Sequence, residues 1–209
     1  MYLRPAFTET DLDRLATMIA TNSFGVLVTR TGAGMEASHI PFLVARDGDS
    51  LVLSAHLGRP NTQCAAFEGG EALAIFGGPH AYIAPGWYAT QPAVPTWDYI
   101  AVHVHGVLEP VDDAAGTLEI LHGLSAHDPL GFTPDTPPAA YMEGMLRGIR
   151  AFRLRSTKIE GQWKMSQNRS VADRQGVVAG LRDLGQTQVA DIIAALLPLP
   201  PAEGRHEGR

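Results

Sequence analysis

The sequence predicts an α+β protein built as an antiparallel β-barrel with helices at its periphery. Three observations support this fold class. Apolar and β-branched runs alternate with glycine-containing turns from residue 24 to residue 56, which is the pattern of hairpin-linked strands. Similar runs recur at residues 71–84, 99–111 and 149–159. Apolar residues at helical spacing occur before, between and after these strands.

Length and composition indicate one domain. The 209 residues suffice for a single core, and no linker or internal repeat divides them, so we expect a domain over residues 1–197 and a disordered tail over 198–209. No apolar run reaches the roughly 18 residues that cross a bilayer, and the N-terminus lacks a signal-peptide core. The single Cys64 allows no internal disulfide and suits a reducing compartment. We therefore expect a cytoplasmic protein without membrane association.

The first half of the chain predicts a helix followed by a meander. The run from Thr8 to Asp11 is typical of a helix start, and apolar spacing continues to about Asn22. Three strands then follow, joined by the turns TGAG and DGDS, over residues 24–30, 35–46 and 51–56. Consecutive hairpins would place these strands side by side. A short helix is expected between LGRPN and the pair Gly69 and Gly70.

The second half predicts more strands and three helices. Strand patterns cover residues 71–78, 80–84, 99–111 and 149–159, the last with one wet face. Helical spacing covers residues 112–127, 171–184 and 187–197, with Ser170 at the start of the second of these helices. The proline-rich stretch 128–138 predicts an irregular loop.

The segment from Pro79 to Tyr99 concentrates aromatic residues. It holds two of the three tryptophans, Trp87 and Trp97, three of the five tyrosines and four prolines. Proline removes a backbone donor and fixes φ, so we expect short extended pieces and turns here and no α-helix. Rings on such a stiff backbone suit contact with a flat ligand or a partner chain. The alternative is that the rings cap the end of a sheet.

The segment from His56 to Asn61 is a candidate phosphate site. It passes from a strand end into a helix start, where free backbone N–H groups, Arg59 and the Asn61 amide would meet. The alternative is an ordinary capped helix start.

A second polar cluster runs from Trp163 to Arg169. Donors such as Lys164, Gln167 and Asn168 match the carbonyls and nitrogens of a heteroaromatic ring, and a cation stabilises an electron-rich reduced ring. The alternative is that Ser166 or Asn168 caps the next helix and the charged side chains are solvated.

Histidines and catalytic motifs give no further site. His103 and His105 are two residues apart on one strand and so face the same side, where they could ligate a metal. No cysteine or carboxylate cluster accompanies them, so we expect hydrogen-bonded histidines and no metal. Nucleophile elbow, phosphate loop and dinucleotide fingerprint are absent from the sequence, and no residue is assigned a catalytic role.

The charge argues against an autonomous DNA-binding protein. The net charge is −6, and no lysine- or arginine-rich tract occurs in the sequence. Non-specific DNA affinity comes from neutralising phosphates with such residues, so direct nucleic-acid binding is not expected.

Several ungapped blocks in order resemble the PaiB family over nearly the whole chain. The blocks are MYLRPAF, SHIPF, HLGRPN, FGGPHAYIAPGWY, VPTWDY and KMSQNR. That family is described as FMN-binding negative transcriptional regulators, and its members resemble the FMN-binding split β-barrel flavoproteins, which are usually homodimers with flavin at the subunit interface.

The resemblance implies a split barrel, a homodimer and FMN as cofactor. Within these blocks we expect the FMN phosphate near Arg59 and Asn61, with Ser38 and His39 beside them, and His56 among the cofactor-binding residues. The isoalloxazine ring would then contact Trp87, Tyr88 or Trp97. Its polar edge would meet Lys164, Ser166, Gln167 and Asn168.

Three functions remain open at this point. The first is a regulator of transcription that acts through a partner or a small-molecule signal, because the acidic chain shows no DNA-reading helix. The second is a flavin-dependent oxidoreductase with a nicotinamide donor and an unidentified acceptor. The third is a barrel that has lost its ligand. Whether the protein is an enzyme stays open in the sequence.

Overall fold

The computed structural model describes residues 1–198, and the predicted disorder of the tail concerns residues that lie outside this range, apart from Pro198. The chain forms two compact units. The first unit comprises Met1–Leu3, Thr8–Gly78 and Ala101–Gln162, and the second comprises Arg4–Phe7, Pro79–Ile100 and the chain from Trp163 onward. Three long strands run from one unit into the other. The single domain stays a prediction.

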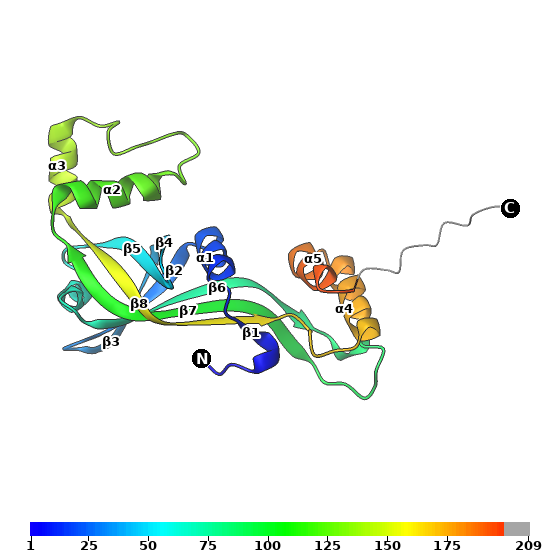
Figure 1. Ribbon diagram of the computed structural model, residues 1–209. Helices are drawn as coiled ribbons and strands as arrows, with labels where there is room; N and C mark the ends of the chain where they lie inside the picture. The colour runs from blue at the N-terminus through cyan, green and yellow to red at the C-terminus, as the bar shows by residue number, and fades with distance from the viewer. Residues whose placement is uncertain (199–209) are drawn as a thin grey trace. The chain divides into compact units, whose positions relative to one another are not determined.

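One antiparallel sheet of eight strands organises the chain (Figure 1). Its strand order is β3-β2-β6-β7-β8-β5-β4, and β1 pairs with β8 outside this path. The strands are β1 (Thr8–Glu9), β2 (Phe24–Thr31), β3 (Gly34–Pro41), β4 (Leu43–Asp47), β5 (Ser50–Gly58), β6 (Glu71–Ile83), β7 (Thr96–Val111) and β8 (Ile149–Lys164). Among residues 1–198, the two end strands of this order, β3 and β4, do not pair with each other, so the sheet is not closed. The predicted α+β class with a split antiparallel barrel is confirmed.

The predicted meander is wrong at its second strand. The run 35–46 forms two strands, because Pro41 offers no N–H and Phe42 turns into the core, where it is 1% exposed. Its ring lies 5.3 Å from that of Phe76 and 6.4 Å from that of Phe152. As a result β3 pairs with β2 while β4 pairs with β5, and these two hairpins occupy opposite ends of the strand order.

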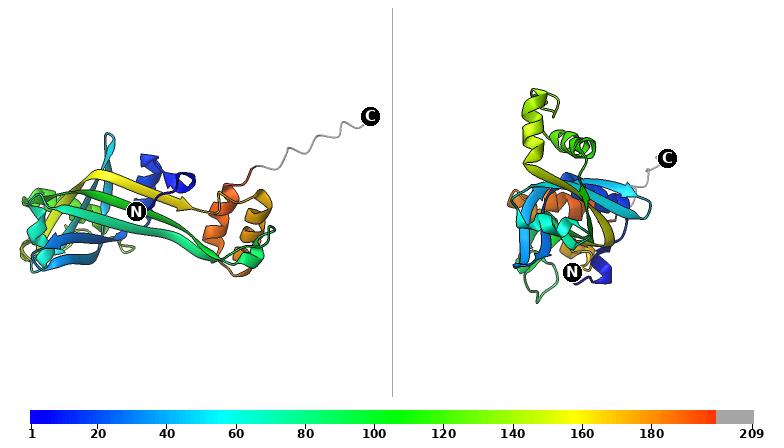
Figure 2. Two further views of the ribbon diagram at one scale, coloured as in Figure 1. Left: turned by 90° about the horizontal axis from the view of Figure 1, so that it is seen from below. Right: turned by 90° about the vertical axis from the view of Figure 1, so that its left-hand side faces the viewer.

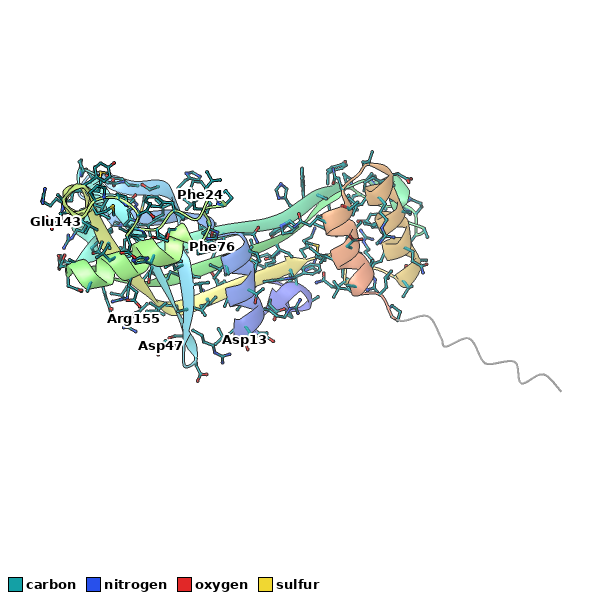
Figure 3. All side chains as sticks on the ribbon, turned by 90° about the horizontal axis from the view of Figure 1, so that it is seen from above. Asp13, Phe24, Asp47, Phe76, Glu143 and Arg155 are labelled. Atoms are coloured by element: carbon teal, nitrogen blue, oxygen red, sulfur yellow. The ribbon has the colours of Figure 1, made fainter. Side chains whose placement is uncertain are left out.

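The register of the outer strands follows from this break. The β5 strand pairs with β8, with Val52 opposite Arg155 and Gly58 opposite Ile149. The tip of the β4–β5 hairpin is held by ion pairs, from Arg46 to Asp13 at 2.6 Å and from Arg155 to Asp47 at 3.0 Å. Figure 3 shows Asp47 near this tip and Asp13 on the neighbouring α1 helix.

Five α-helices and three 3₁₀ helices complete the described chain. The α-helices are α1 (Leu12–Thr21), α2 (Ala114–Ser125), α3 (Ala139–Arg147), α4 (Val171–Asp183) and α5 (Thr187–Ala195). The 3₁₀ helices are η1 (Pro5–Phe7), η2 (Thr62–Phe67) and η3 (Pro85–Trp87). Four of the α-helices confirm predictions, and α3 was not predicted. The short helix predicted after LGRPN is η2.

Local capping explains the best-predicted helix starts. The Asp11 carboxylate accepts from the N–H groups of Asp13 and Arg14 at the start of α1, and the Ser170 hydroxyl accepts from that of Asp173 at the start of α4. The strand predictions were too short, because β6 is continuous through residue 79, β7 begins at Thr96 and β8 extends to Lys164. Between β6 and β7 the aromatic segment contains only the short η3, as its prolines predict.

Candidate functional site

The predicted site residues fall into two groups. Ser38, His39, His56, Arg59 and Asn61 lie in the first unit, at β3 and at the end of β5. The second unit contains Trp87, Tyr88, Trp97, Lys164, Ser166, Gln167 and Asn168. Their joint use by one cofactor stays a prediction.

Asn61 caps the helix that follows β5. Its side-chain oxygen accepts from the N–H of Gln63 at 2.9 Å, and its amide nitrogen donates to the Ser38 hydroxyl at 3.1 Å. Ser38 in turn donates to the Gln63 side chain. The interpretation of this segment as a capped helix start is therefore confirmed for Asn61. Contact with a phosphate stays a prediction.

Gln63 was missed by sequence reasoning and holds this corner together. It is 1% exposed, and its amide donates to the Leu27 carbonyl at 3.2 Å, the Thr29 hydroxyl at 2.9 Å and the Glu36 carbonyl at 3.2 Å. A buried amide with all these bonds fixes β2, β3 and η2 to one another. A lone glutamine in TQCAAF carries no sequence signal for such a role.

Arg59 lines a cavity of about 340 Å³ together with Arg147 and Arg150. Its Nε donates to the Arg147 carbonyl oxygen at 2.9 Å, which joins the end of β5 to the end of α3. Arg150 pairs with Glu68 and Asp112, and these contacts raise the pKa of its guanidinium. Asp112 and Glu143 also line this cavity, so Arg59 and Arg147, which form no ion pair among the described residues, are its candidates for binding a phosphate. Arg147 and Arg150 were not predicted, because they lie about ninety residues from Arg59 along the chain.

His56 lines a second cavity, which is apolar and has a volume of about 450 Å³. The Nδ1 atom of His56 is buried and has no hydrogen-bond partner among the described residues. Burial lowers the pKa of the imidazole, so the ring is neutral at pH 7. His39, in contrast, is exposed, and its ring stacks on Phe24 with centroids 6.3 Å apart.

In the second unit, the polar cluster is organised by Asp98, which was also missed. The carboxylate is 1% exposed and accepts from the Ser166 hydroxyl at 2.6 Å, while the Lys164 ammonium lies 3.6 Å away. Burial raises the pKa of Asp98, and its contacts with Ser166 and Lys164 oppose the rise. Lys164 also donates to the Thr96 hydroxyl at 2.6 Å and to the Trp97 carbonyl.

The side chains that follow Lys164 form a local turn. Ser166 has a φ of 57°, in the left-handed region. The Gln167 side chain accepts from the Met165 N–H at 2.7 Å and donates to the Trp163 carbonyl. Asn168 is exposed, and Ser170 caps α4, so the interpretation of Ser166 or Asn168 as the helix cap is wrong.

The aromatic residues of the second unit divide by exposure. Trp87 packs on α4, where a Cβ atom at Gly176 would meet its carbonyl oxygen and one at Gly180 would meet its indole ring. Tyr88 is buried, and the Arg169 guanidinium carbon lies 4.2 Å from its ring centroid. Trp97 is 55% exposed and lies edge-on to Tyr82 at 5.9 Å. Trp97 is therefore the one of the three whose ring has most of its surface open to a ligand.

One histidine of the pair contacts a carboxylate. His105 Nε2 lies 2.9 Å from Glu160 Oε2, which supports the hydrogen-bonded alternative. Residues 1–198 contain no group of three or more His, Cys, Asp or Glu side chains arranged to hold a metal ion. Within the same range, no helix has both the length and the apolar character needed to cross a membrane.

Solved structures agree with the fold. The flavocytochrome Anf3 from Azotobacter vinelandii is 13% identical with a TM-score of 0.60, and the alignment covers 78% of this chain and 72% of that chain. The FAD and heme binding protein from Mycobacterium smegmatis is 16% identical with a TM-score of 0.56, covering 75% and 73%. With the antiparallel sheet described above, these similarities define an α+β protein with a split β-barrel fold.

The chain belongs to the family FMN_bind_2, described as "Putative FMN-binding domain", whose model matches residues 1–158. A curated relative, "Protease synthase and sporulation protein PAI 2" from Bacillus subtilis (strain 168), is 32% identical over 187 residues, which cover 88% of this chain and 90% of that protein. The resemblance to the PaiB family is thereby confirmed, and FMN is the cofactor of the family to which the chain belongs.

Proposed function

We propose that this chain is an FMN-binding regulator that affects transcription through a partner or a small-molecule signal, without binding DNA directly. The observation that carries the proposal is the use of its cationic side chains. Within residues 1–198, eight of them form ion pairs with carboxylates: Arg14, Arg46, Arg150, Arg153, Arg155, Lys158, Lys164 and Arg182. Figure 3 labels one such cation, Arg155. Paired cations on a chain of net charge −6 have little capacity to neutralise DNA phosphates.

The cellular setting of this proposal is a cytoplasmic homodimer. The family resemblance supports the dimer, and the lone buried Cys64 suits a reducing compartment. The name of the Bacillus relative, "Protease synthase and sporulation protein PAI 2", includes sporulation, which supports a regulatory role.

A gel-shift experiment tests indirect action. Purified protein with bound FMN is expected to leave promoter DNA unshifted at physiological salt, because the chain has a net charge of −6 and eight of its cations are paired with carboxylates. Repeating the experiment at low salt provides the control, since weak non-specific binding appears there first. Sub-micromolar, sequence-dependent binding at physiological salt would contradict the proposal.

We further propose that Arg59 holds the FMN phosphate. The arginine-lined cavity lies in the first unit, and the family match over residues 1–158 includes Arg59 but ends before Lys164. Arg59→Ala is expected to weaken FMN binding by about 1 to 3 kcal/mol, the usual worth of a hydrogen bond to a charged group. Arg153→Ala is the matched control, because Arg153 forms a surface pair with Glu119 at 3.5 Å. Fluorescence quenching of added FMN measures both affinities.

Lys164→Ala and Gln167→Ala test the ring-edge assignment in the same titration. If these side chains contact the isoalloxazine edge, each is expected to weaken FMN binding by about 1 to 3 kcal/mol. Unchanged FMN affinity in both variants would contradict the ring-edge assignment. The two side chains would then serve only to hold the local structure that they form with Trp163, Met165 and Asp98. The FMN affinity of Arg59→Ala tests the phosphate assignment independently of these two variants.

A flavin-dependent oxidoreductase is the second candidate. The apolar cavity beside His56 favours it, because a volume of about 450 Å³ can admit a small organic acceptor. In such an enzyme FMN supplies the redox chemistry and the protein orients the reactants. Bleaching of the flavin absorbance on adding reduced nicotinamide under anaerobic conditions supports this candidate, and an unchanged spectrum favours the regulator.

A further inference from the structure

We propose that the apolar cavity beside His56 binds a small uncharged organic molecule that carries a hydroxyl group. The cavity lies within the first unit, between β5, α2, the segment 128–138 and α3. Figures 1 and 2 show α2 and α3 as neighbouring helices joined by that segment. A role for this molecule as the regulator's signal rests on the proposed function. Its binding to the protein rests on the cavity alone.

The size and lining of the cavity suit a small apolar molecule. Its volume of about 450 Å³ is within the range of ligand sites in proteins. The apolar lining comes from both helices, the intervening segment and the start of β8: Leu121, Leu124, Phe132, Pro134, Pro137, Tyr141, Met142, Met145, Leu146 and Ile149. A ligand that removes an apolar lining of this kind from water lowers the free energy of the system.

The α3 side of the cavity is left uncovered by the chain itself. The nine residues of α3 all belong to the described chain, and none of them is buried. Tyr141 is 59% exposed and Met145 is 52% exposed, although both line the cavity. A short helix normally owes its stability to a packed apolar face. An occupant of the cavity would supply that packing for α3.

The charges around the cavity favour an uncharged occupant. Among the described residues, no lysine or arginine lines it. Of its polar lining residues, Asp128 already accepts from the Leu130 N–H at 2.6 Å, and the Ser125 hydroxyl donates to the His122 carbonyl at 2.8 Å. An anion would therefore find no cationic partner, in contrast to the arginine-lined cavity at Arg59.

His56 supplies the polar contact. Its buried Nδ1 lacks a hydrogen-bond partner among the described residues, which leaves one polar group of the lining unsatisfied. His56 lines the cavity, and the broad χ2 torsion of histidine allows its ring to reorient toward a ligand. A hydroxyl group can donate or accept, so it pairs with either tautomer of the neutral ring.

Equilibrium dialysis of the FMN-loaded protein against 1-naphthol tests the proposal. We expect saturable binding of one molecule per chain. Naphthalene lacks the hydroxyl and is expected to bind about fivefold more weakly, as the loss of one neutral hydrogen bond implies. The anion 1-naphthoate is expected to bind more weakly still. In His56→Phe the preference for naphthol over naphthalene should disappear.

Met145→Trp is the variant that fills the cavity mouth, and it is expected to weaken naphthol binding at least tenfold, because the larger ring takes the ligand's space. Leu184→Trp is the control: Leu184 is 65% exposed and lies in the second unit, outside the cavity lining. Thermal unfolding of both variants checks that they fold.

Four results would overturn the proposal. The first is no saturable naphthol binding, and the second is naphthol binding that Met145→Trp leaves unchanged. The third is release of FMN by naphthol into the dialysate, which would make the cavity the flavin's own site. The fourth is a change of subunit number in Met145→Trp, which would make α3 a subunit contact. The proposed function is tested separately, by whether the protein retains FMN and by the gel-shift experiment.

Discussion

Gly176→Ala is expected to lower the free energy of unfolding by about 3 kcal/mol, at the upper end of the range for overpacking. A Cβ atom at this position would lie 2.0 Å from the Trp87 carbonyl oxygen. Backbone atoms cannot yield as a flexible side chain does, so α4 and the aromatic segment would have to separate. This cost exceeds the gain of about 1 kcal/mol that alanine normally brings to a helix interior. Urea denaturation measures the change.

Gly144→Ala in α3 is the matched control. The nearest atom to its added Cβ is the Arg147 Nη2 at 3.7 Å, an ordinary contact distance. Helix propensity then acts alone, and a gain of up to about 1 kcal/mol is expected. A Gly176→Ala protein as stable as the wild type would contradict the close approach of Trp87 to α4.

Substitution of Gly180 distinguishes the contact of α4 with the Trp87 indole ring from its contact with the Trp87 backbone. A Cβ atom there would lie 2.4 Å from Trp87 Cε2, so Gly180→Ala is also expected to destabilise the protein. In a Trp87→Ala background the indole is gone and the cost of Gly180→Ala should shrink. The cost of Gly176→Ala should persist, because the carbonyl at residue 87 remains.

Asp98→Ala is the second change with a large expected effect, a loss of about 2 to 3 kcal/mol in the free energy of unfolding. Asp98 is 1% exposed, and its removal leaves the Ser166 hydroxyl and the Lys164 ammonium without their carboxylate. Asp98→Asn keeps an acceptor oxygen for Ser166, so a smaller loss of about 1 kcal/mol is expected. Urea denaturation at pH 7 compares the two variants.

The contribution of Asp98 to the free energy of unfolding depends on pH with a defined sign. Burial raises the pKa of Asp98, so the folded protein binds this proton more tightly than the unfolded chain does. The stability that Asp98 contributes is therefore fully present below its unfolded pKa of about 3.9 and falls as pH rises toward the folded value. The cost of Asp98→Asn relative to wild type should be larger in acid than at neutral pH. The opposite trend would show that Lys164 and Ser166 outweigh burial.

Local chemistry accounts for the elements that the sequence predicted well. The Asp11 and Ser170 caps and the prolines of the aromatic segment act within a few residues of themselves, so their effects can be read along the chain. The break at Phe42 could not be read in this way. It depends on Phe76 and Phe152, which are distant in sequence and meet Phe42 only in the folded core.

The candidate site shows the same division. The sequence blocks located Arg59, Asn61, Lys164 and Ser166, but not the side chains that bind them. Asp98 and Gln63 were missed because a single buried carboxylate or amide has no pattern of its own. Arg147 was missed because its contact with Arg59 joins α3 to β5 across 88 positions of sequence.

By itself, the sequence determined the α+β class, most helix starts, the family and its FMN cofactor, because these follow from short-range patterns and recognisable blocks. Only the tertiary structure decided which strands pair, which polar side chains are satisfied internally and which cavity is left apolar beside His56. The physical reason is that hydrogen-bond partners and buried surface are fixed by contacts between distant segments, whose free energy no single stretch of sequence contains.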